Sequence, residues 1–369
     1  MATWDKDNIT TKNGQQVSAM APVIVSASRS TDIPAFYSDW FFHRLSEGYS
    51  AWKNPFNGKY SYVSYHRTKF IVFWSKNPLP LLNHLDELKT QNGGIGCYIQ
   101  YTMNDYDNEG LEKGVPPLLN RIDTFKRLVD FFGGPGQVIW RHDPLILTGK
   151  IDSNQLLDKI ERIGDQLKGY TRRLVFSYAD IAEYTKVRRN LENNGINYKE
   201  WQQEQMVDFA TKLVEMNHSK GWDYELATCG EPGRYPGIIP NHCVDDRLIV
   251  KYGYKHPELL KLLGAEIITP MGDLFGTPEI PSDAIELEGG KYAIIKKNNR
   301  DAGQRTACGC CISKDIGEYN TCPHQCEYCY ANTSKEVAMR NWEAYKNNKF
   351  GETIKGQKNV IYSRFSIFE

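Results

Sequence analysis

Six short apolar runs, separated by longer helical stretches, restrict the fold of this chain more than any other feature of its sequence. Each run is rich in valine, isoleucine and aromatic residues, which is typical of strands buried on both faces of a sheet. The six runs are residues 22–27, 70–74, 96–102, 137–140, 173–178 and 223–228. Strands that alternate with helices indicate a parallel sheet with crossover connections. We therefore expect an α/β protein built as a partial or distorted (β/α) TIM-type barrel of about six parallel strands.

Glycines mark the ends of several helical stretches between these runs. Helices are expected at 35–47, 120–132, 153–168 and 199–220, and a glycine follows each of them directly. Glycine adopts the left-handed conformation of a helix cap without steric cost. The expected division of the chain is an N-terminal extension (1–21), the barrel units (22–231), an irregular region (232–304) and a cysteine-rich segment (305–369) with a helix at 334–347.

Polar side chains follow nearly every apolar run, at the edge where such folds place their active sites. The catalytic candidates are Arg29, Asp32, Arg141 and Asp143, and the cofactor-binding candidates are Ser26, Lys76 and Asn77. Each arginine could pair with a carboxylate or phosphate of a ligand, or form a salt bridge to the nearby aspartate. The aspartates could bind ribose hydroxyls or act as acid or base, or they could only hydrogen-bond to strand ends. We expect all these side chains to line one mouth.

Three cysteines near the C-terminus are the strongest functional signal. Cys322, Cys326 and Cys329 have C-x3-C-x2-C spacing, with Tyr328 directly before the third cysteine. We call residues 322–329 the cysteine loop. Three thiolates on such a loop can hold a [4Fe-4S] cluster, but they leave one iron without a protein ligand. An open coordination position is what chemistry at a metal requires, whereas closed four-ligand sites are mainly structural.

The cysteine loop resembles the signature of the radical S-adenosylmethionine (SAM) superfamily, C-x3-C-x-aromatic-C. The resemblance implies a [4Fe-4S] cluster whose fourth iron is chelated by SAM, and a reduced cluster that breaks a sulfonium C–S bond to begin radical chemistry. It also implies a barrel fold, a place for Tyr328 near the adenine, and an electron donor such as flavodoxin or ferredoxin. Residues 326–331 look most like the spore photoproduct lyase branch, so a lyase acting on a nucleic-acid photoproduct is an alternative.

Nearly the whole chain also resembles a bacterial family of unknown function that carries such cysteines at its C-terminus. The segments that carry this resemblance are 26–34 (SASRSTDIP), 54–56 (NPF), 71–78 (IVFWSKNP) and 138–144 (VIWRHDP), together with the cysteine loop. In the wider radical SAM superfamily the cysteines normally lie near the start of the barrel. We therefore expect the loop of this chain to fold back over the mouth of the barrel from the other end of the sequence.

Five further cysteines are candidates for a second metal site. Cys229 and Cys243 flank a turn-rich loop, and Cys308, Cys310 and Cys311 lie within four residues. Four of these thiols could hold an auxiliary iron–sulfur cluster or a zinc ion. They could also remain buried free cysteines. Alternatively, one of them could close the fourth position of the main cluster, which would make that cluster an electron-transfer or structural site.

Zinc is the alternative for the cysteine loop itself. Cys322, His324, Cys326 and Cys329 are four potential zinc ligands, although His324 is closer to both flanking cysteines than is usual among zinc ligands. This interpretation predicts a zinc-stabilised binding module without catalysis. A fully ligated cluster instead predicts a redox or scaffold protein whose cluster does not respond to SAM.

Composition restricts the substrate and the compartment. The chain has 45 basic and 45 acidic residues and no net charge, whereas proteins that bind duplex nucleic acid usually have an excess of basic residues. This balance favours a small-molecule or peptide substrate. The sequence has no apolar stretch long enough to span a membrane and no apolar N-terminal region typical of a signal peptide. Nine cysteines, six of them within 308–329, favour reduced metal ligands over disulfides and hence the cytoplasm.

Overall fold

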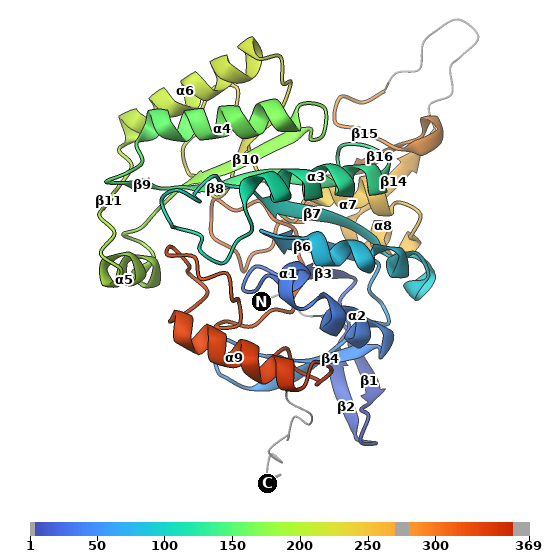
Figure 1. Ribbon diagram of the computed structural model, residues 1–369. Helices are drawn as coiled ribbons and strands as arrows, with labels where there is room; N and C mark the ends of the chain where they lie inside the picture. The colour runs from blue at the N-terminus through green and yellow to red at the C-terminus, as the bar shows by residue number, and fades with distance from the viewer. Residues whose placement is uncertain (1–3, 270–279, 357–369) are drawn as a thin grey trace, which may run out of the picture.

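Eight strands form the central sheet of the protein (Figure 1). The computed structural model describes residues 4–269 and 280–356. Six of the strands coincide with the predicted apolar runs: β3 (Ile24–Ala27), β6 (Phe70–Ser75), β7 (Gly96–Thr102), β8 (Val138–Leu145), β10 (Arg173–Tyr178) and β12 (Glu225–Thr228). The short strands β13 (Ile239–Pro240) and β17 (Lys314–Asp315) add one strand at each edge.

The six predicted strands are neighbours in order of sequence, as expected when short crossover connections join parallel strands. The order across the sheet is β13-β12-β10-β8-β7-β6-β3-β17, and every neighbouring pair is parallel. Within the described ranges, no pairing joins β13 to β17, so the sheet is open. An α/β fold with a large parallel sheet is therefore confirmed, but closure into a TIM-type barrel is not found.

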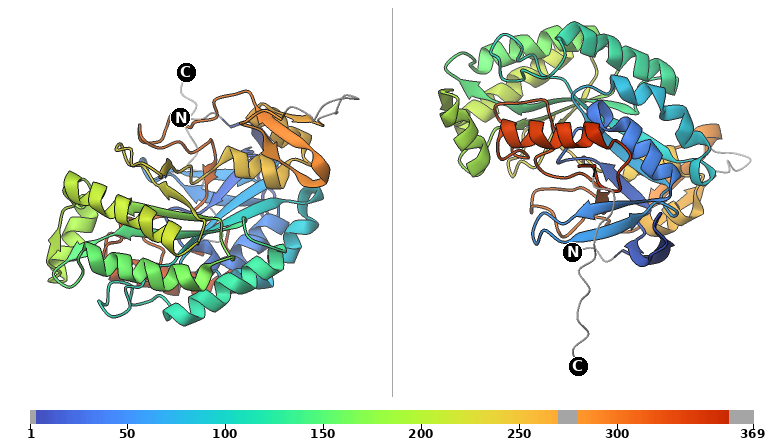
Figure 2. Two further views of the ribbon diagram at one scale, coloured as in Figure 1. Left: turned by 90° about the horizontal axis from the view of Figure 1, so that it is seen from above. Right: turned by 60° about the horizontal axis from the view of Figure 1, so that its bottom comes forward.

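Both faces of the sheet are covered, which explains why the strands are apolar on both sides. On one face lie α3 (Leu118–Phe132), α4 (Ser153–Leu167) and α6 (Gln203–Ser219), as Figure 2 shows. On the other face lie α7 (Asp246–Gly253), α8 (Pro257–Leu263) and a small sheet of β14 (Ala265–Ile268), β16 (Tyr292–Ile295) and β15 (Ile285–Glu286). Successive strand residues alternate between the two layers: Phe73 and Ile99 belong to the first core cluster, Val72 and Tyr98 to the second.

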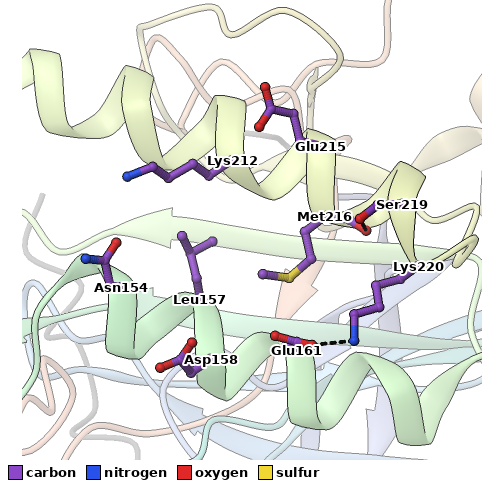
Figure 3. A pocket seen from close by; sticks show the side chains of 9 residues that line it. All are labelled: Asn154, Leu157, Asp158, Glu161, Lys212, Glu215, Met216, Ser219 and Lys220. Atoms are coloured by element: carbon purple, nitrogen blue, oxygen red, sulfur yellow. Dashed lines mark hydrogen bonds and ion pairs between the residues drawn. The ribbon is translucent and has the colours of Figure 1, made fainter.

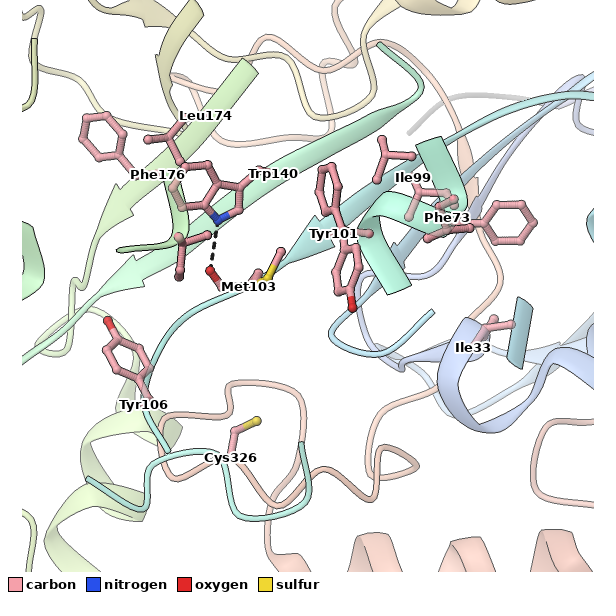
Figure 4. Packing of buried hydrophobic residues seen from close by; sticks show 14 of the residues in the cluster. Ile33, Phe73, Ile99, Tyr101, Met103, Tyr106, Trp140, Leu174, Phe176 and Cys326 are labelled. Atoms are coloured by element: carbon pink, nitrogen blue, oxygen red, sulfur yellow. Dashed lines mark hydrogen bonds between the residues drawn. The ribbon is translucent and has the colours of Figure 1, made fainter. Parts of the chain in front are cut away.

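The first core cluster extends to the edge of the sheet where the strands end. The indole N–H of Trp140 donates to the carbonyl oxygen of Met103 at 3.0 Å, and the ring lies beside Leu174 and Phe176 (Figure 4). Cys326 belongs to the same buried cluster. The cysteine loop is therefore packed against the main core, although it comes from the end of the chain.

Several elements have no counterpart in the sequence-based prediction. A four-stranded sheet combines β1 (Lys6–Thr10), β2 (Gln16–Met20), β5 (Tyr60–Ser64) and β4 (Tyr49–Lys53). The others are α5 (Thr185–Asn193), β9 (Leu147–Thr148), β11 (Tyr198–Lys199) and the 3₁₀ helices η1 (Leu79–Asn83), η2 (Leu85–Lys89), η3 (Gln91–Gly93) and η4 (Glu288–Gly290). The helix predicted at 35–47 is present as α2 (Ser38–Ser46), preceded by the short α1 (Ile33–Phe36). The region expected to be irregular, 232–304, contains α7, α8 and the small sheet. In the part of the chain that is described, no helix is long and apolar enough to cross a membrane.

Parts of three expected regions lie outside the described residues. These are 1–3 of the N-terminal extension, 270–279 of the region 232–304, and 357–369 of the cysteine-rich segment. The described remainder of the cysteine-rich segment includes β17, the cysteine loop and α9 (Lys335–Asn347).

The C-terminal segment returns to the beginning of the sheet. Lys314 and Asp315 of β17 pair with Val25 and Ser26 of β3. Helix α9 lies beside α1 and α2 (Figures 1 and 2), where the rings of its Trp342 and of Tyr37 meet edge to face at 5.2 Å. Because the cysteine loop lies between β17 and α9 in sequence, these two contacts place it at the carboxyl end of β3.

Lys314 provides a test of this returning segment. Burial lowers the pKa of its amine from 10.5 to about 7, against the raising effect of Asp315. Between pH 10.5 and about 7 the unfolded chain binds this proton more readily than the folded protein does. The resulting loss in the free energy of unfolding grows as the pH falls through that range and is constant below it. We expect Lys314→Met to raise the free energy of unfolding below pH 7 and to have little effect near pH 10.5, as measured by urea unfolding.

The exposed Lys291 supplies the control, since Lys291→Met should show no such pH dependence. A pH-independent effect of Lys314→Met would contradict the prediction. It would show that the ring of Trp52, which lies under the Lys314 amine, keeps that amine protonated through a cation–π contact.

Candidate functional site

Asp32 joins the cysteine loop to the sheet. It caps α1, where its Oδ1 accepts a hydrogen bond from the N–H of Ala35 at 3.0 Å. The same carboxylate accepts hydrogen bonds from the hydroxyl of Ser75 and the N–H of Lys76, both at 2.7 Å. Its Oδ2 also lies 2.7 Å from Nε2 of His324 in the cysteine loop. One carboxylate thus connects the ends of β3 and β6 to the loop.

A buried network holds the other side of the loop. The hydroxyl of Tyr328 bonds to Nζ of Lys76 and to Nδ2 of Asn104, each at 3.0 Å, and it donates to Glu112. Lys76 Nζ lies 2.6 Å from Glu112 Oε1, and Arg121 lies 3.7 Å from the other oxygen. Burial raises the pKa of Glu112, but Lys76 and Arg121 lower it to about 2, so the carboxylate is ionised. Lys76 and Tyr328, both predicted to bind a cofactor, therefore share one network.

Backbone contacts fix the path of the loop. The N–H of Glu327 donates to the carbonyl oxygen of Leu111 at 2.9 Å, and Asn332 Nδ2 donates to the carbonyl oxygen of Cys322 at 2.8 Å. Gly114 lies so close that a Cβ there would stand 2.7 Å from the carbonyl oxygen of His324, so only glycine fits this approach. The loop is thus held by the segment between β7 and α3 as well as by Asp32.

The three thiols of the loop are near enough to influence one another. Burial raises the pKa of Cys322 to about 12, with smaller contributions from Asp32 and Cys329. Burial also raises the pKa of Cys326 and Cys329, and Lys76 acts in the opposite direction on both. The thiols of Cys322 and Cys326 are therefore protonated at neutral pH without a metal, and a metal would bind with release of protons.

His324 is not available as a zinc ligand in this arrangement. Its Nε2 contacts Asp32, and its Nδ1 lies 3.1 Å from the carbonyl oxygen of Gly114. Among residues 4–269 and 280–356, no three His, Cys, Asp or Glu side chains converge where they could hold one metal ion. In a [4Fe-4S] cluster each cysteine binds a different iron, so this result concerns sites for a single ion.

A second group of predicted residues surrounds Trp74. Its indole N–H donates to Ser26 Oγ at 3.1 Å, and the guanidinium groups of Arg29 and Arg141 each lie 5.4 Å from its ring. Arg141 forms the salt bridge to Asp143 that we considered from the sequence. Burial lowers the pKa of Arg141, but Cys243, Asp143 and Cys229 raise it well above its usual range.

Arg29 does not form the ion pair to Asp32 that was the alternative to ligand binding, because the Asp32 carboxylate is occupied by the contacts described above. The N–H of Arg29 donates to Asp315 Oδ2 at 2.8 Å. Its side-chain NH2 is buried and has no hydrogen-bond partner among the described residues. Asn77 joins the first group through its backbone, because its N–H donates to Ser75 Oγ at 2.9 Å.

Four of the five upstream cysteines meet in this second group. Cys229 Sγ lies 3.0 Å from Cys243 Sγ, and Cys310 is close enough to Cys243 and to Cys308 for each pair to influence one another's pKa. We call these four residues the thiol quartet. No hydrogen bond joins the Cys311 thiol to another cysteine in the described part of the chain, although it is buried nearby. All nine cysteines are free.

The two groups lie on opposite faces of the sheet at its carboxyl edge. Trp74 and Ser75 are consecutive in β6, so their side chains point to opposite sides. Ser75 bonds to Asp32 beneath the cysteine loop, whereas Trp74 lies among the arginines next to the thiol quartet. The polar strand ends therefore form two sites at one edge, not the one mouth that the sequence suggested.

Two described cavities differ in their relation to these groups. A groove of about 670 Å³ lies between α4 and α6, away from both groups, and the ion pair of Lys220 and Glu161 borders it (Figure 3). A pocket of about 480 Å³ borders the cysteine loop, with Glu327, Leu111 and Thr148 in its lining. The first groove is the wider of the two, but only the second could place a small molecule next to the loop.

Sequence reasoning missed Glu112 and the role of His324 as a partner of Asp32. Glu112 lies in the irregular segment between β7 and α3, where no periodicity indicates which side chains point inward. His324 stood out only as a potential zinc ligand. Its nearness to the cysteines was visible, but its carboxylate partner is hundreds of residues away and cannot be read from one sequence.

Comparison with known proteins identifies the family. A model described as domain of unknown function (DUF1848) matches residues 24–331, and the chain therefore belongs to that family. The matched segment includes the six predicted strands and all nine cysteines. Neither a curated protein nor a solved structure matches the chain.

Glu112 should be essential for the stability of the site. Glu112→Gln leaves the buried Lys76 and Arg121 without their shared counter-charge, and we expect a loss of about 3–5 kcal/mol in the free energy of unfolding. Urea unfolding measures this loss. Glu266→Gln removes an exposed partner of Lys296 and should cost less than about 1 kcal/mol. Equal effects of the two substitutions would contradict the network described here.

Cys308 should be the most readily alkylated thiol of the metal-free protein near neutral pH. The hydrogen bond from the Cys310 thiol lowers the pKa of Cys308 to about 7, against the effect of burial. The thiolate is the reactive form, so iodoacetamide labelling of Cys308 should increase as the pH rises through 7. Peptide mass spectrometry would show it. Cys97, whose pKa burial raises to about 12, serves as the unreactive reference, and labelling of Cys97 before Cys308 would refute the prediction.

Proposed function

We propose that this member of the DUF1848 family is a radical SAM enzyme whose Cys322, Cys326 and Cys329 hold a [4Fe-4S] cluster. The observation that carries the proposal is the C-x3-C-x2-C loop with its aromatic residue, held against the carboxyl ends of β3 and β6 by Asp32. Ligands of open α/β sheets bind at this edge. A three-thiolate site on a wall of strands is what a partial radical SAM barrel would need.

The residues of the loop fit such a cluster. Its three cysteines are free, and His324 is engaged elsewhere, so the loop offers three thiolates and no fourth ligand. Burial raises the pKa of Cys329, and the nearby Lys76 and Lys186 act against this by favouring its thiolate. The backbone N–H of Asn332 donates to Cys329 Sγ at 3.3 Å, the kind of contact that stabilises a cluster-bound sulfur. When bound, the reduced cluster supplies the electron that cleaves a C–S bond of SAM.

The protein's own residues position the loop and exclude water. Asp32 sets the distance between the loop and the sheet, and the ionised Glu112 holds Lys76 and Tyr328 in place. Because the network holds the Tyr328 hydroxyl, this residue can offer only its ring to a ligand. The pocket bordered by Glu327 supports a small-molecule or peptide substrate, as does the zero net charge. The electron would come from a donor such as flavodoxin or ferredoxin, and nine free cysteines support a reducing compartment, the cytoplasm.

Anaerobic reconstitution with Fe²⁺ and sulfide tests the proposal. We expect the protein to bind a [4Fe-4S] cluster, the EPR signal of the reduced cluster to change when SAM is added, and 5′-deoxyadenosine to accumulate. Cys326→Ala should reduce both the SAM-responsive signal and the product to background, because one of three cluster ligands is lost. Cys97→Ala, a buried cysteine within β7, should retain both.

Other outcomes would replace the proposal. A colourless protein with stoichiometric zinc would indicate the zinc-stabilised binding module. A cluster whose EPR signal ignores SAM would indicate a redox protein. Methylthioadenosine as the product would retain SAM cleavage but assign it to a different C–S bond, that of an aminocarboxypropyl transfer. Restoration of intact bases within irradiated DNA strands would identify the photoproduct-lyase activity.

A further inference from the structure

Three separate parts of the chain bring four thiols together at the face of the sheet opposite the cysteine loop. Cys229 follows β12, Cys243 precedes α7, and Cys308 and Cys310 belong to the segment that leads to β17. The sulfurs of Cys229 and Cys243 approach to 3.0 Å, and Cys310 lies near enough to Cys243 and Cys308 to influence the pKa of both. Burial of free cysteines does not by itself require such convergence, since Cys97 and Cys311 are buried without a thiol bond.

Glycine residues allow the cysteine-bearing segments to approach closely. A Cβ on Gly309, between Cys308 and Cys310, would stand 2.2 Å from Nε2 of His242. A Cβ on Gly230, next to Cys229, would stand 2.6 Å from the guanidinium of Arg305. A histidine side chain and an arginine side chain therefore pack directly against the backbone beside the quartet cysteines.

Three arginines lie around the thiol quartet, and one of them has a buried donor without an acceptor. Arg141 NH1 lies 3.1 Å from Cys243 Sγ, and Arg305 and Arg29 are close enough to interact electrostatically with the quartet thiols. Asp143 pairs with Arg141, but the buried NH2 of Arg29 has no partner among the described residues. A buried N–H donor without an acceptor is costly, and a neutral thiol is a weak acceptor. Thiolates bound to a metal would be strong acceptors for these N–H groups.

We propose that Cys229, Cys243, Cys308 and Cys310 hold a second metal centre, either a zinc ion or an iron–sulfur cluster. Four thiolates around Zn²⁺ or a [4Fe-4S]²⁺ core give a net charge of −2, which suits a site lined by Arg29, Arg141 and Arg305. Sulfurs that share one tetrahedral zinc stand about 3.8 Å apart, given a Zn–S bond of about 2.3 Å. The approach of Cys229 and Cys243 is therefore tighter than in a loaded site, so metal binding would move these two sulfurs apart. No single-ion site is formed in the described residues.

The proposal does not depend on the cysteine loop, and the test separates the two. The protein is purified anaerobically and loaded with either Zn²⁺ or Fe²⁺ and sulfide, and zinc, iron and sulfide are measured per chain. A triple variant, Cys322→Ala/Cys326→Ala/Cys329→Ala, removes the loop ligands only. We expect this variant to retain one metal centre: one zinc ion without colour, or iron and sulfide in equal amounts with visible absorption. The retained metal distinguishes the two chemistries.

Adding Cys243→Ser to the triple variant should remove that metal, because Cys243 contacts two other thiols of the quartet. Adding Cys311→Ser is the matched control and should leave the metal in place. Cys308→Ser, at the half-exposed end of the quartet, repeats the test with less risk to folding, which circular dichroism would monitor. A triple variant that binds neither zinc nor iron, or equal losses from Cys243→Ser and Cys311→Ser, would overturn the proposal. If the triple variant keeps its metal but no longer cleaves SAM, the result supports both the cluster at the cysteine loop and the second metal centre at the thiol quartet.

Discussion

The carboxylate of Asp32 is the interaction on which the arrangement of the candidate site depends. It accepts hydrogen bonds from the first turn of α1 and from the end of β6, and it contacts His324 of the cysteine loop. A buried carboxylate is tolerated only when its oxygens are fully hydrogen-bonded, and these partners come from three parts of the chain. Satisfying Asp32 therefore requires the C-terminal loop to be in place. The same requirement explains why Asp32, a catalytic candidate in the sequence, mainly holds three parts of the structure together.

Neighbouring side chains of β6 point to opposite faces of the sheet, so the functional groups at its carboxyl edge form two separate sites. Ser75 directs its hydroxyl to Asp32 and the cysteine loop, and Trp74 carries the two arginines and faces the thiol quartet. Two potential metal centres can thus lie close together without sharing ligands. The buried ion pair of Lys76 and Glu112 separates the cysteine loop from solvent on one face of the sheet. The ion pair of Arg141 and Asp143 orders the side chains on the opposite face. Both centres would belong to one rigid wall of strands.

The sequence was most informative where one residue type repeats at a regular spacing. The strands Gly96–Thr102 and Arg173–Tyr178 were predicted with their observed bounds, because both faces are buried and the apolar run ends where the strand ends. The four-stranded sheet of β1, β2, β5 and β4 was missed because β1 and β2 are largely exposed and lack that pattern. The cysteines were recognised from their spacing, but the selection of four thiols out of five depends on contacts between segments far apart in sequence.

The return of the C-terminal segment to β3 has a consequence for biosynthesis. The first strand of the large sheet leaves the ribosome early, yet its edge partner β17 and the loop that completes Asp32 are made near the end of translation. Contacts between such distant segments form slowly. Until they form, β3 lacks its partner strand at the edge of the sheet. A chain released early would therefore carry most of the sheet but lack the cysteine loop and its contact to Asp32.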